Sequence, residues 1–181
     1  MPGPTAGESL GTHLVIMGPA GCGKSSVAAR LARAQGVPRA EGDDFHSDDA
    51  RQKMAAGVPL TDDDRRPWLQ RLATWMTSHA ATGSVVSCSA LRHNYRNLLR
   101  TAEGTITFIH LDLTRDQLQA RLEARTDHFM PTALLDSQLQ TLEPLRAGEG
   151  ITIDGNQPIE TIVDAIQLVM RSNPGQSQEA P

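Results

Sequence analysis

The sequence has 181 residues, of which 17 are Lys or Arg and 21 are Asp or Glu, giving a formal net charge of −4. This length suits one domain rather than two, and the negative charge and few aromatic residues (two Trp, one Tyr, three Phe) argue against a nucleic-acid partner. No apolar run approaches the roughly 20 residues of a membrane span, and neither a signal peptide nor a disulfide framework is visible, so we expect a cytoplasmic protein with no membrane partner.

Short apolar runs alternate with helical patterns along the chain. The apolar runs predict strands at residues 13–17, 37–40, 84–88, 105–111 and 151–154. Helical spacing predicts helices at residues 25–35, 48–56 and 159–170, and a longer helix capped by Asp64 with Pro67 in its first turn. Strands rich in Val and Ile that alternate with helices predict an α/β fold, with a parallel sheet covered on both faces. We expect one domain over residues 12–171 between flexible tails at residues 1–11 and 172–181.

The strongest motif is the segment Gly18-Pro-Ala-Gly-Cys-Gly-Lys24-Ser25, which fits the phosphate-binding pattern G-x-x-x-x-G-K-[ST] directly between a strand and a helix. Its glycines allow successive N–H groups to point inward, and the helix N-terminus adds positive charge. Lys24 would reach the β- and γ-phosphates of ATP, and the Ser25 hydroxyl would bind Mg²⁺. The alternative is a flexible glycine-rich turn. The expected nucleotide contacts are Gly18, Pro19, Ala20, Gly21, Cys22, Gly23, Lys24, Ser25 and Ser26.

The remaining sequence narrows the class of P-loop protein. It contains no N-K-x-D element, which a GTPase uses to recognise guanine, and it is too short for the large motor or AAA-type ATPases. A small domain with this loop near its start fits a kinase of small molecules. Such an enzyme needs a second pocket for the phosphate acceptor and a lid that excludes water.

Candidate acceptor-side residues follow the second and third predicted strands, at the edge where open α/β sheets bind ligands. Asp43 could accept the proton of an acceptor hydroxyl, although an acidic loop or a helix cap has the same pattern. Ser89 lies in a stretch of small residues that leaves room for substrate. Arg92 and Arg96 follow at helical spacing, and their planar guanidinium groups suit carboxylate or phosphate. The alternative for both arginines is solvated helix charge.

Two further features concern phosphate transfer and the loop itself. Arg121 and Arg125 share one helix face before a predicted loop, so they could close over the transferring phosphate; the alternative is an ordinary exposed face. Cys22 lies beside Lys24 among inward-pointing N–H groups, a setting that predicts a lowered thiol pKa and inactivation by alkylation. The alternative is an inert buried thiol.

Five segments, in this order, resemble the gluconokinases of the thermoresistant type: GPAGCGKS, GDDFH, KMAAGVPLTDDDRRPWL, CSALR…YR and RLEAR…HF. The resemblance covers about residues 13–171. Many proteins share the phosphate loop. The segment PLTDDDRRPWL is more specific, although alone it looks like a charged helix start, and it favours this family over shikimate and nucleotide kinases.

The resemblance implies transfer of the ATP γ-phosphoryl group to the 6-hydroxyl of D-gluconate with Mg²⁺, giving 6-phospho-D-gluconate and ADP. It also implies a three-layer P-loop fold similar to nucleoside monophosphate kinases, with five parallel strands, a moving lid at about residues 122–135 and a homodimer. By matching position, Asp43 becomes the acceptor-side carboxylate, and Arg121 and Arg125 become the lid arginines. The implied gluconate contacts are Asp43, His46, Arg51, Ser89, Arg92, Arg96 and His128.

Two positions depart from the family pattern. Glu41 stands where an Asp is expected, which bears on the surroundings of Mg²⁺, and Arg92 stands where Lys is common. Because gluconate carries a carboxylate at the end opposite its 6-hydroxyl, acceptor-side cations must hold that charge, and we favour Arg96 with Arg92. Two other interpretations stay open: a kinase of another small hydroxy acid such as shikimate, and a nucleotide-binding regulatory module without catalysis.

Overall fold

A computed structural model describes residues 10–124 and 132–172. Its central sheet has five strands: β1 (Thr12–Met17), β2 (Arg39–Glu41), β3 (Ser84–Ser87), β4 (Thr105–Asp112) and β5 (Gly150–Asp154). They lie in the order β2-β3-β1-β4-β5, and every neighbouring pair is parallel. This arrangement confirms the predicted α/β fold with a five-stranded parallel sheet.

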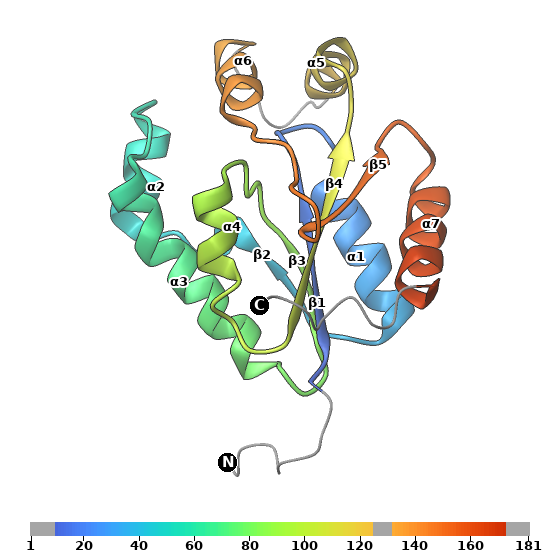
Figure 1. Ribbon diagram of the computed structural model, residues 1–181. Helices are drawn as coiled ribbons and strands as arrows, with labels where there is room; N and C mark the ends of the chain where they lie inside the picture. The colour runs from blue at the N-terminus through green and yellow to red at the C-terminus, as the bar shows by residue number, and fades with distance from the viewer. Residues whose placement is uncertain (1–9, 125–131, 173–181) are drawn as a thin grey trace.

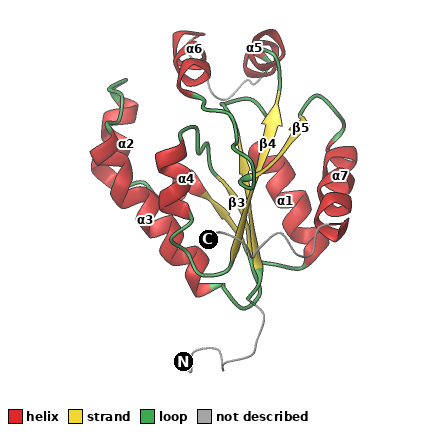
Figure 2. Ribbon diagram, in the orientation of Figure 1, coloured by secondary structure: helices red, strands yellow, loops and turns green. Residues whose placement is uncertain are grey.

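Helices cover both faces of this sheet (Figures 1 and 2). They are α1 (Lys24–Gln35), α2 (Asp48–Ala55), α3 (Asp62–Ser78), α4 (His93–Leu99), α5 (Arg115–Glu123), α6 (Thr132–Thr141) and α7 (Ile159–Ser172), with a short 3₁₀ helix at Gly42–Phe45. Alternate residues of β1 point to opposite layers: Ile16 packs with α1 and α7, whereas Met17 packs with α3 and α4. Both faces of the central strand are therefore buried, which explains its continuous apolar sequence.

The start of α3 differs from the prediction. Its N-cap is Thr61, whose hydroxyl accepts from the Asp64 N–H while the Asp64 carboxylate accepts from the Thr61 N–H. This reciprocal capping, with three acidic residues at the positive helix end, starts the helix before Asp64 and leaves Pro67 beyond the first turn. The second strand is also shifted, because β2 begins at Arg39 and includes Glu41.

The carboxyl ends of the strands form one edge of the sheet, and α5 and α6 stand above it in Figure 1. The expected lid at about residues 122–135 lies partly outside the described residues, as do most of the two expected tails. Within residues 10–124 and 132–172, no helix is long and apolar enough to cross a membrane.

Candidate active site

The phosphate loop connects β1 to α1 and depends on glycine at three positions. Gly18, Gly21 and Gly23 have φ values of 139°, 86° and 97°, which residues with a side chain rarely adopt. Space is also restricted, because a Cβ on Gly21 would lie 3.0 Å from the Leu122 side chain of α5. The loop therefore has the backbone that can direct N–H groups toward a phosphate.

Lys24 and Ser25 lie at the start of α1, directly after this loop. The Lys24 ammonium donates to the Pro19 carbonyl at 2.9 Å, so it folds back across the loop. The Ser25 hydroxyl donates to Glu41 Oε2 at 2.9 Å, and Glu41 also accepts from Ser87 and pairs with Arg39. A hydroxyl and a carboxylate oxygen, beside the place of the phosphates, fit the oxygen ligands and bound waters that Mg²⁺ prefers. Glu41 was noted in the sequence only as a departure, yet it directly contacts Ser25.

Arg121 lies beside the phosphate loop. It is half-buried, and its guanidinium donates to the Cys22 carbonyl at 3.3 Å and to the Gly155 carbonyl at 2.9 Å. The alternative of an ordinary exposed helix face is thus wrong for Arg121. Arg125 and His128 lie outside the described residues.

Helix α6 also contacts the phosphate loop, which the sequence did not indicate. The Gln138 side-chain oxygen accepts from the Ala20 N–H at 2.7 Å. The Gln138 amide oxygen is thus the hydrogen-bond acceptor of one N–H group of the loop. Helices α5 and α6, which flank residues 125–131 in the sequence, therefore both contact the phosphate loop.

The turn at residues 42–46 presents Asp43, and side chains from two helices hold its backbone. The Trp68 indole donates to the Gly42 carbonyl at 2.6 Å, Arg51 donates to the Asp44 carbonyl at 2.7 Å, and Arg71 donates to the Phe45 carbonyl. The Asp43 side chain itself is 91% exposed, and its carboxylate lies 3.9 Å from His46 Nε2. A fixed turn with a free carboxylate is what an acceptor-side base requires.

His46 is packed underneath Asp43. Its ring stacks on Trp68 with centroids 4.1 Å apart, and its Nε2 lies 3.9 Å from the Asp43 carboxylate. Burial lowers the pKa of His46, and its Nδ1 has no hydrogen-bond partner in the described part of the chain. Arg51, also a predicted gluconate contact, is engaged with the backbone of this turn.

A cluster of polar side chains joins α3 to the start of α4. Asp62 accepts from the Tyr95 hydroxyl at 2.6 Å, and the Arg92 guanidinium lies 3.5 Å from the same carboxylate. Arg65 donates to the Tyr95 hydroxyl. The Tyr95 hydrogen bond is the main cause that lowers the pKa of Asp62. Arg92 and Arg65 therefore converge on one carboxylate, and Arg65 is a candidate that the sequence did not single out.

Arg96 has a different role from the one predicted. Its side chain is 0% exposed, and its guanidinium donates to Glu149, to the Ala90 carbonyl at 2.9 Å and to the carbonyls of Glu143 and Pro144. A guanidinium enclosed by these partners is not available to a substrate, so the prediction that Arg96 contacts the acceptor carboxylate is wrong. The helical spacing did not reveal which side of α4 faces the interior.

The prediction of a lowered thiol pKa is also wrong. Cys22 is 1% exposed. Burial raises its pKa, outweighing the opposite effect of Lys24. Cys88 is buried as well, and burial raises its pKa to about 12. Both residues fit the inert buried thiol that was the alternative.

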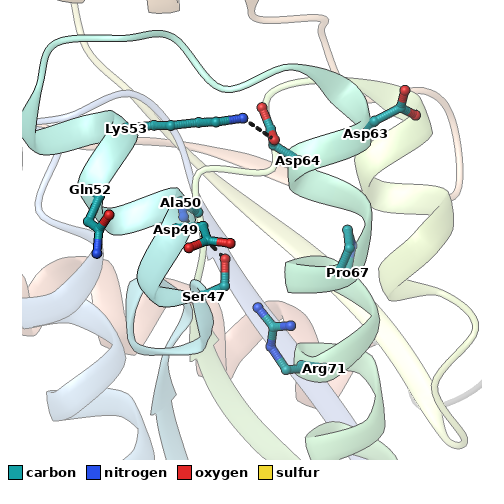
Figure 3. Close-up of a pocket in the computed structure, with 9 residues that line it drawn as sticks. All are labelled: Ser47, Asp49, Ala50, Gln52, Lys53, Asp63, Asp64, Pro67 and Arg71. Atoms are coloured by element: carbon teal, nitrogen blue, oxygen red, sulfur yellow. Dashed lines mark hydrogen bonds and ion pairs between the residues drawn. The ribbon is translucent and has the colours of Figure 1, made fainter.

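A separate hollow of about 580 Å³ lies between α2 and α3, as Figure 3 shows. Its lining includes Lys53, which pairs with Asp64 at 2.6 Å, and Arg71, which is bound to the Phe45 carbonyl. The lining contains no residue of the phosphate loop and neither Asp43 nor Arg92. This hollow is therefore distinct from the candidate active site.

The fold and the site together define a P-loop kinase of small molecules. A family model described as Shikimate kinase matches residues 20–150. The chain is 46% identical over 132 residues to a gluconokinase of Gluconobacter oxydans, covering 72% of this chain and 74% of that protein. It is 40% identical to the thermoresistant gluconokinase of Escherichia coli, covering 82% and 87% of the two chains. The crystal structure of a gluconokinase from Sinorhizobium meliloti is 39% identical, with a TM-score of 0.82 and coverage of 94% and 99%.

This chain belongs to the gluconokinase family, within the larger group that the shikimate kinase model describes. The resemblance seen in the sequence is thereby confirmed.

Proposed function

We propose that this protein transfers the γ-phosphoryl group of ATP to the 6-hydroxyl of D-gluconate, giving 6-phospho-D-gluconate and ADP. One observation carries the proposal: three loops meet at one edge of the sheet. The Gly18 N–H donates to the Ser89 carbonyl at 3.3 Å, and Gly42 packs so closely that a Cβ there would lie 2.6 Å from the Ser87 carbonyl. ATP bound by the phosphate loop would thus lie beside a gluconate held by the loops that follow β2 and β3.

On the nucleotide side, the phosphate loop binds ATP through its N–H groups and Lys24. Lys24 exchanges its internal contact with Pro19 for the β- and γ-phosphates, where it neutralises charge. Ser25 and Glu41 would hold Mg²⁺, directly or through bound water, and the bound metal would screen the charge of the phosphates. Ser26, on the exposed side of the same helix turn, completes the predicted nucleotide set.

On the acceptor side, Asp43 accepts the proton of the 6-hydroxyl as that oxygen attacks the γ-phosphorus. His46 lies against Asp43, and burial lowers the pKa of its ring. One ring N–H of His46 can be donated to the acceptor or to Asp43. Ser89 lines the other side of the acceptor.

The carboxylate of gluconate binds Arg92, with Arg65 as its partner in place of Arg96. Both guanidinium groups face the Asp62 carboxylate, so they are already directed at one negative charge. A charge-assisted pair contributes about 1.5–3 kcal/mol, or roughly tenfold to a hundredfold in affinity. Glucose and sorbitol lack this charge, and the enzyme should reject both.

The lid contribution comes from Arg121, already beside the phosphate loop, together with Arg125 and His128. The proposal also includes a single domain over residues 12–171, a homodimer and a cytoplasmic location. Light scattering of the purified protein tests the dimer, since a monomer mass would contradict it.

A coupled ADP assay with D-gluconate, shikimate, glucose and sorbitol tests the function. Turnover with gluconate alone is expected. Turnover with shikimate in preference to gluconate would instead support the family-model description. ATP binding without turnover on any of the four acceptors would favour a regulatory module.

A further inference from the structure

The loop after β3 is held at three successive carbonyl groups by three different parts of the protein. The Ser89 carbonyl accepts from Gly18 of the phosphate loop at 3.3 Å, and the Leu91 carbonyl accepts from the Glu143 N–H at 2.8 Å. Between them, the Ala90 carbonyl accepts from the Arg96 guanidinium at 2.9 Å. The loop thus joins the nucleotide side to the connection between α6 and β5.

The centre of this loop has an unfavourable backbone conformation. Ala90 has a φ of 44°, and it is the one residue other than glycine with positive φ among the described residues. A side chain at such a position is strained, and the conformation persists only where surrounding contacts impose it. Arg96 supplies the contact at the strained residue itself, so the loop depends on how firmly Arg96 is fixed.

Glu149, at the end of that connection, fixes Arg96. Glu149 is 3% exposed and accepts from Arg96 Nε and Nη2, both at 3.2 Å. It also accepts from the Arg146 N–H at 2.7 Å, which orients the carboxylate. His93 and Arg100 lie 3.3 Å and 3.5 Å from the same carboxylate. A buried guanidinium held at two nitrogens has little freedom to turn.

We propose that Glu149 is a positioning residue for the acceptor site. Acting through Arg96, it holds the Ala90 turn and thereby places Ser89 and Arg92. Arg92 directly follows this loop and is the N-cap of α4, so a shift of the turn moves its guanidinium away from the acceptor. This inference rests on the proposed acceptor role of Arg92. It explains why Arg96 and Glu149, which lie 53 positions apart in the sequence, form a buried ion pair next to this loop. It predicts a change in gluconate affinity rather than in ATP affinity.

The decisive variant is Arg96→Met/Glu149→Leu. Replacing both members of a buried ion pair by apolar residues of similar size is often neutral for folding, whereas removing one leaves an unpaired charge. We expect the double variant to fold with a lower melting temperature, because the carbonyls of Ala90, Glu143 and Pro144 lose their donor. Its ATP affinity should be retained, while the KM for D-gluconate rises at least about tenfold. Amide hydrogen exchange over residues 88–93 should also become faster without substrate, which measures the loop independently of activity.

The matched control is Arg100→Gln, which removes another partner of Glu149 without touching the loop, and it should leave both KM values unchanged. If the double variant does not fold, Arg96→Lys replaces it, because a lysine keeps the charge but cannot reach Glu149 and Ala90 together. A folded variant with a normal gluconate KM, or with equal losses for ATP and gluconate, would overturn the proposal. Failure of the proposed function can be distinguished from failure of the positioning role, because the unmodified protein would then show no turnover with gluconate.

Discussion

On the proposed nucleotide side of the site, one continuous run from Gly18 to Ser25 would supply most of the contacts, largely through its backbone, with Glu41 and Arg121 beside it. On the acceptor side, Asp43, Ser89 and Arg92 come from separate segments, and side chains of α2, α3 and α4 hold the loops that carry them. The nucleotide side is therefore a local structure. The acceptor side forms only when segments distant in the sequence pack together. Its affinity for the acceptor therefore depends also on the residues that hold these loops in place.

The largest effect is expected for Lys24→Ala, which removes the point charge at the phosphates. We expect kcat to fall by about a thousandfold, since the loss of one electrostatic contact at a transition state costs on the order of 10²–10³. The fold should persist, because within the described residues the Lys24 ammonium is hydrogen-bonded only to its own loop. Steady-state kinetics and a melting curve measure both. Lys53→Ala, at the other lysine of the sequence, is the control, and near-normal turnover in Lys24→Ala would contradict the nucleotide assignment.

Asp43→Asn tests whether the fixed turn serves chemistry or binding. Loss of a general base costs roughly 10²–10⁴ in rate, and we expect a fall in kcat of about a hundredfold with the gluconate KM nearly unchanged. Asp44→Asn changes the neighbouring exposed carboxylate and should have little effect. If Asp43→Asn raised the KM while kcat stayed normal, Asp43 would be a binding residue.

Arg92→Met should change affinity more than turnover. Loss of one charge-assisted pair to the gluconate carboxylate raises KM roughly tenfold to a hundredfold, while the KM for ATP stays the same. Arg65→Met should behave similarly and Arg66→Met should not. Phosphorylation of glucose as well as gluconate by the unmodified protein would show that no carboxylate is recognised.

The nucleotide side can be predicted from the sequence better than the acceptor side, because its residues are contiguous. The phosphate loop, Lys24 and Ser25 could be placed because their pattern is contiguous and its neighbours are a strand and a helix. The strand order and the role of Arg96 could not be placed in this way. Arg96 is bound to Glu149, which lies 53 positions further along the chain, and helical spacing alone does not distinguish a buried face from a substrate-facing one. Trp68 was part of a specific motif, but its bond to Gly42 joins two segments that only the fold brings together.

Trp68→Phe should lower stability and catalytic efficiency moderately, because Trp68 is hydrogen-bonded to the turn that carries Asp43. It removes the indole N–H from the Gly42 carbonyl and leaves a buried acceptor without its partner, which costs about 1–3 kcal/mol. We expect a lower melting temperature and a loss of several-fold in kcat/KM for gluconate, with ATP affinity retained. Trp75→Phe is the control, because Trp75 packs edge-on against Phe45 and the hydrogen bond to Gly42 comes from Trp68. An equal loss in both variants would indicate only a general packing defect.

The smallest effect is expected for thiol reagents. The thiolate is the nucleophile, so each unit by which burial raises a thiol pKa lowers the reactive fraction about tenfold at neutral pH. Cys22 and Cys88 are both buried with raised pKa values, and iodoacetamide should therefore leave the folded enzyme active for hours. Labelling should become fast only in denaturant, as mass spectrometry can measure. Rapid inactivation that Mg-ATP prevents, and that disappears in Cys22→Ser, would instead show that the phosphate loop opens often enough to expose its thiol. Burial of Cys22 would then be transient, and the nucleotide side would be a structure that opens and closes.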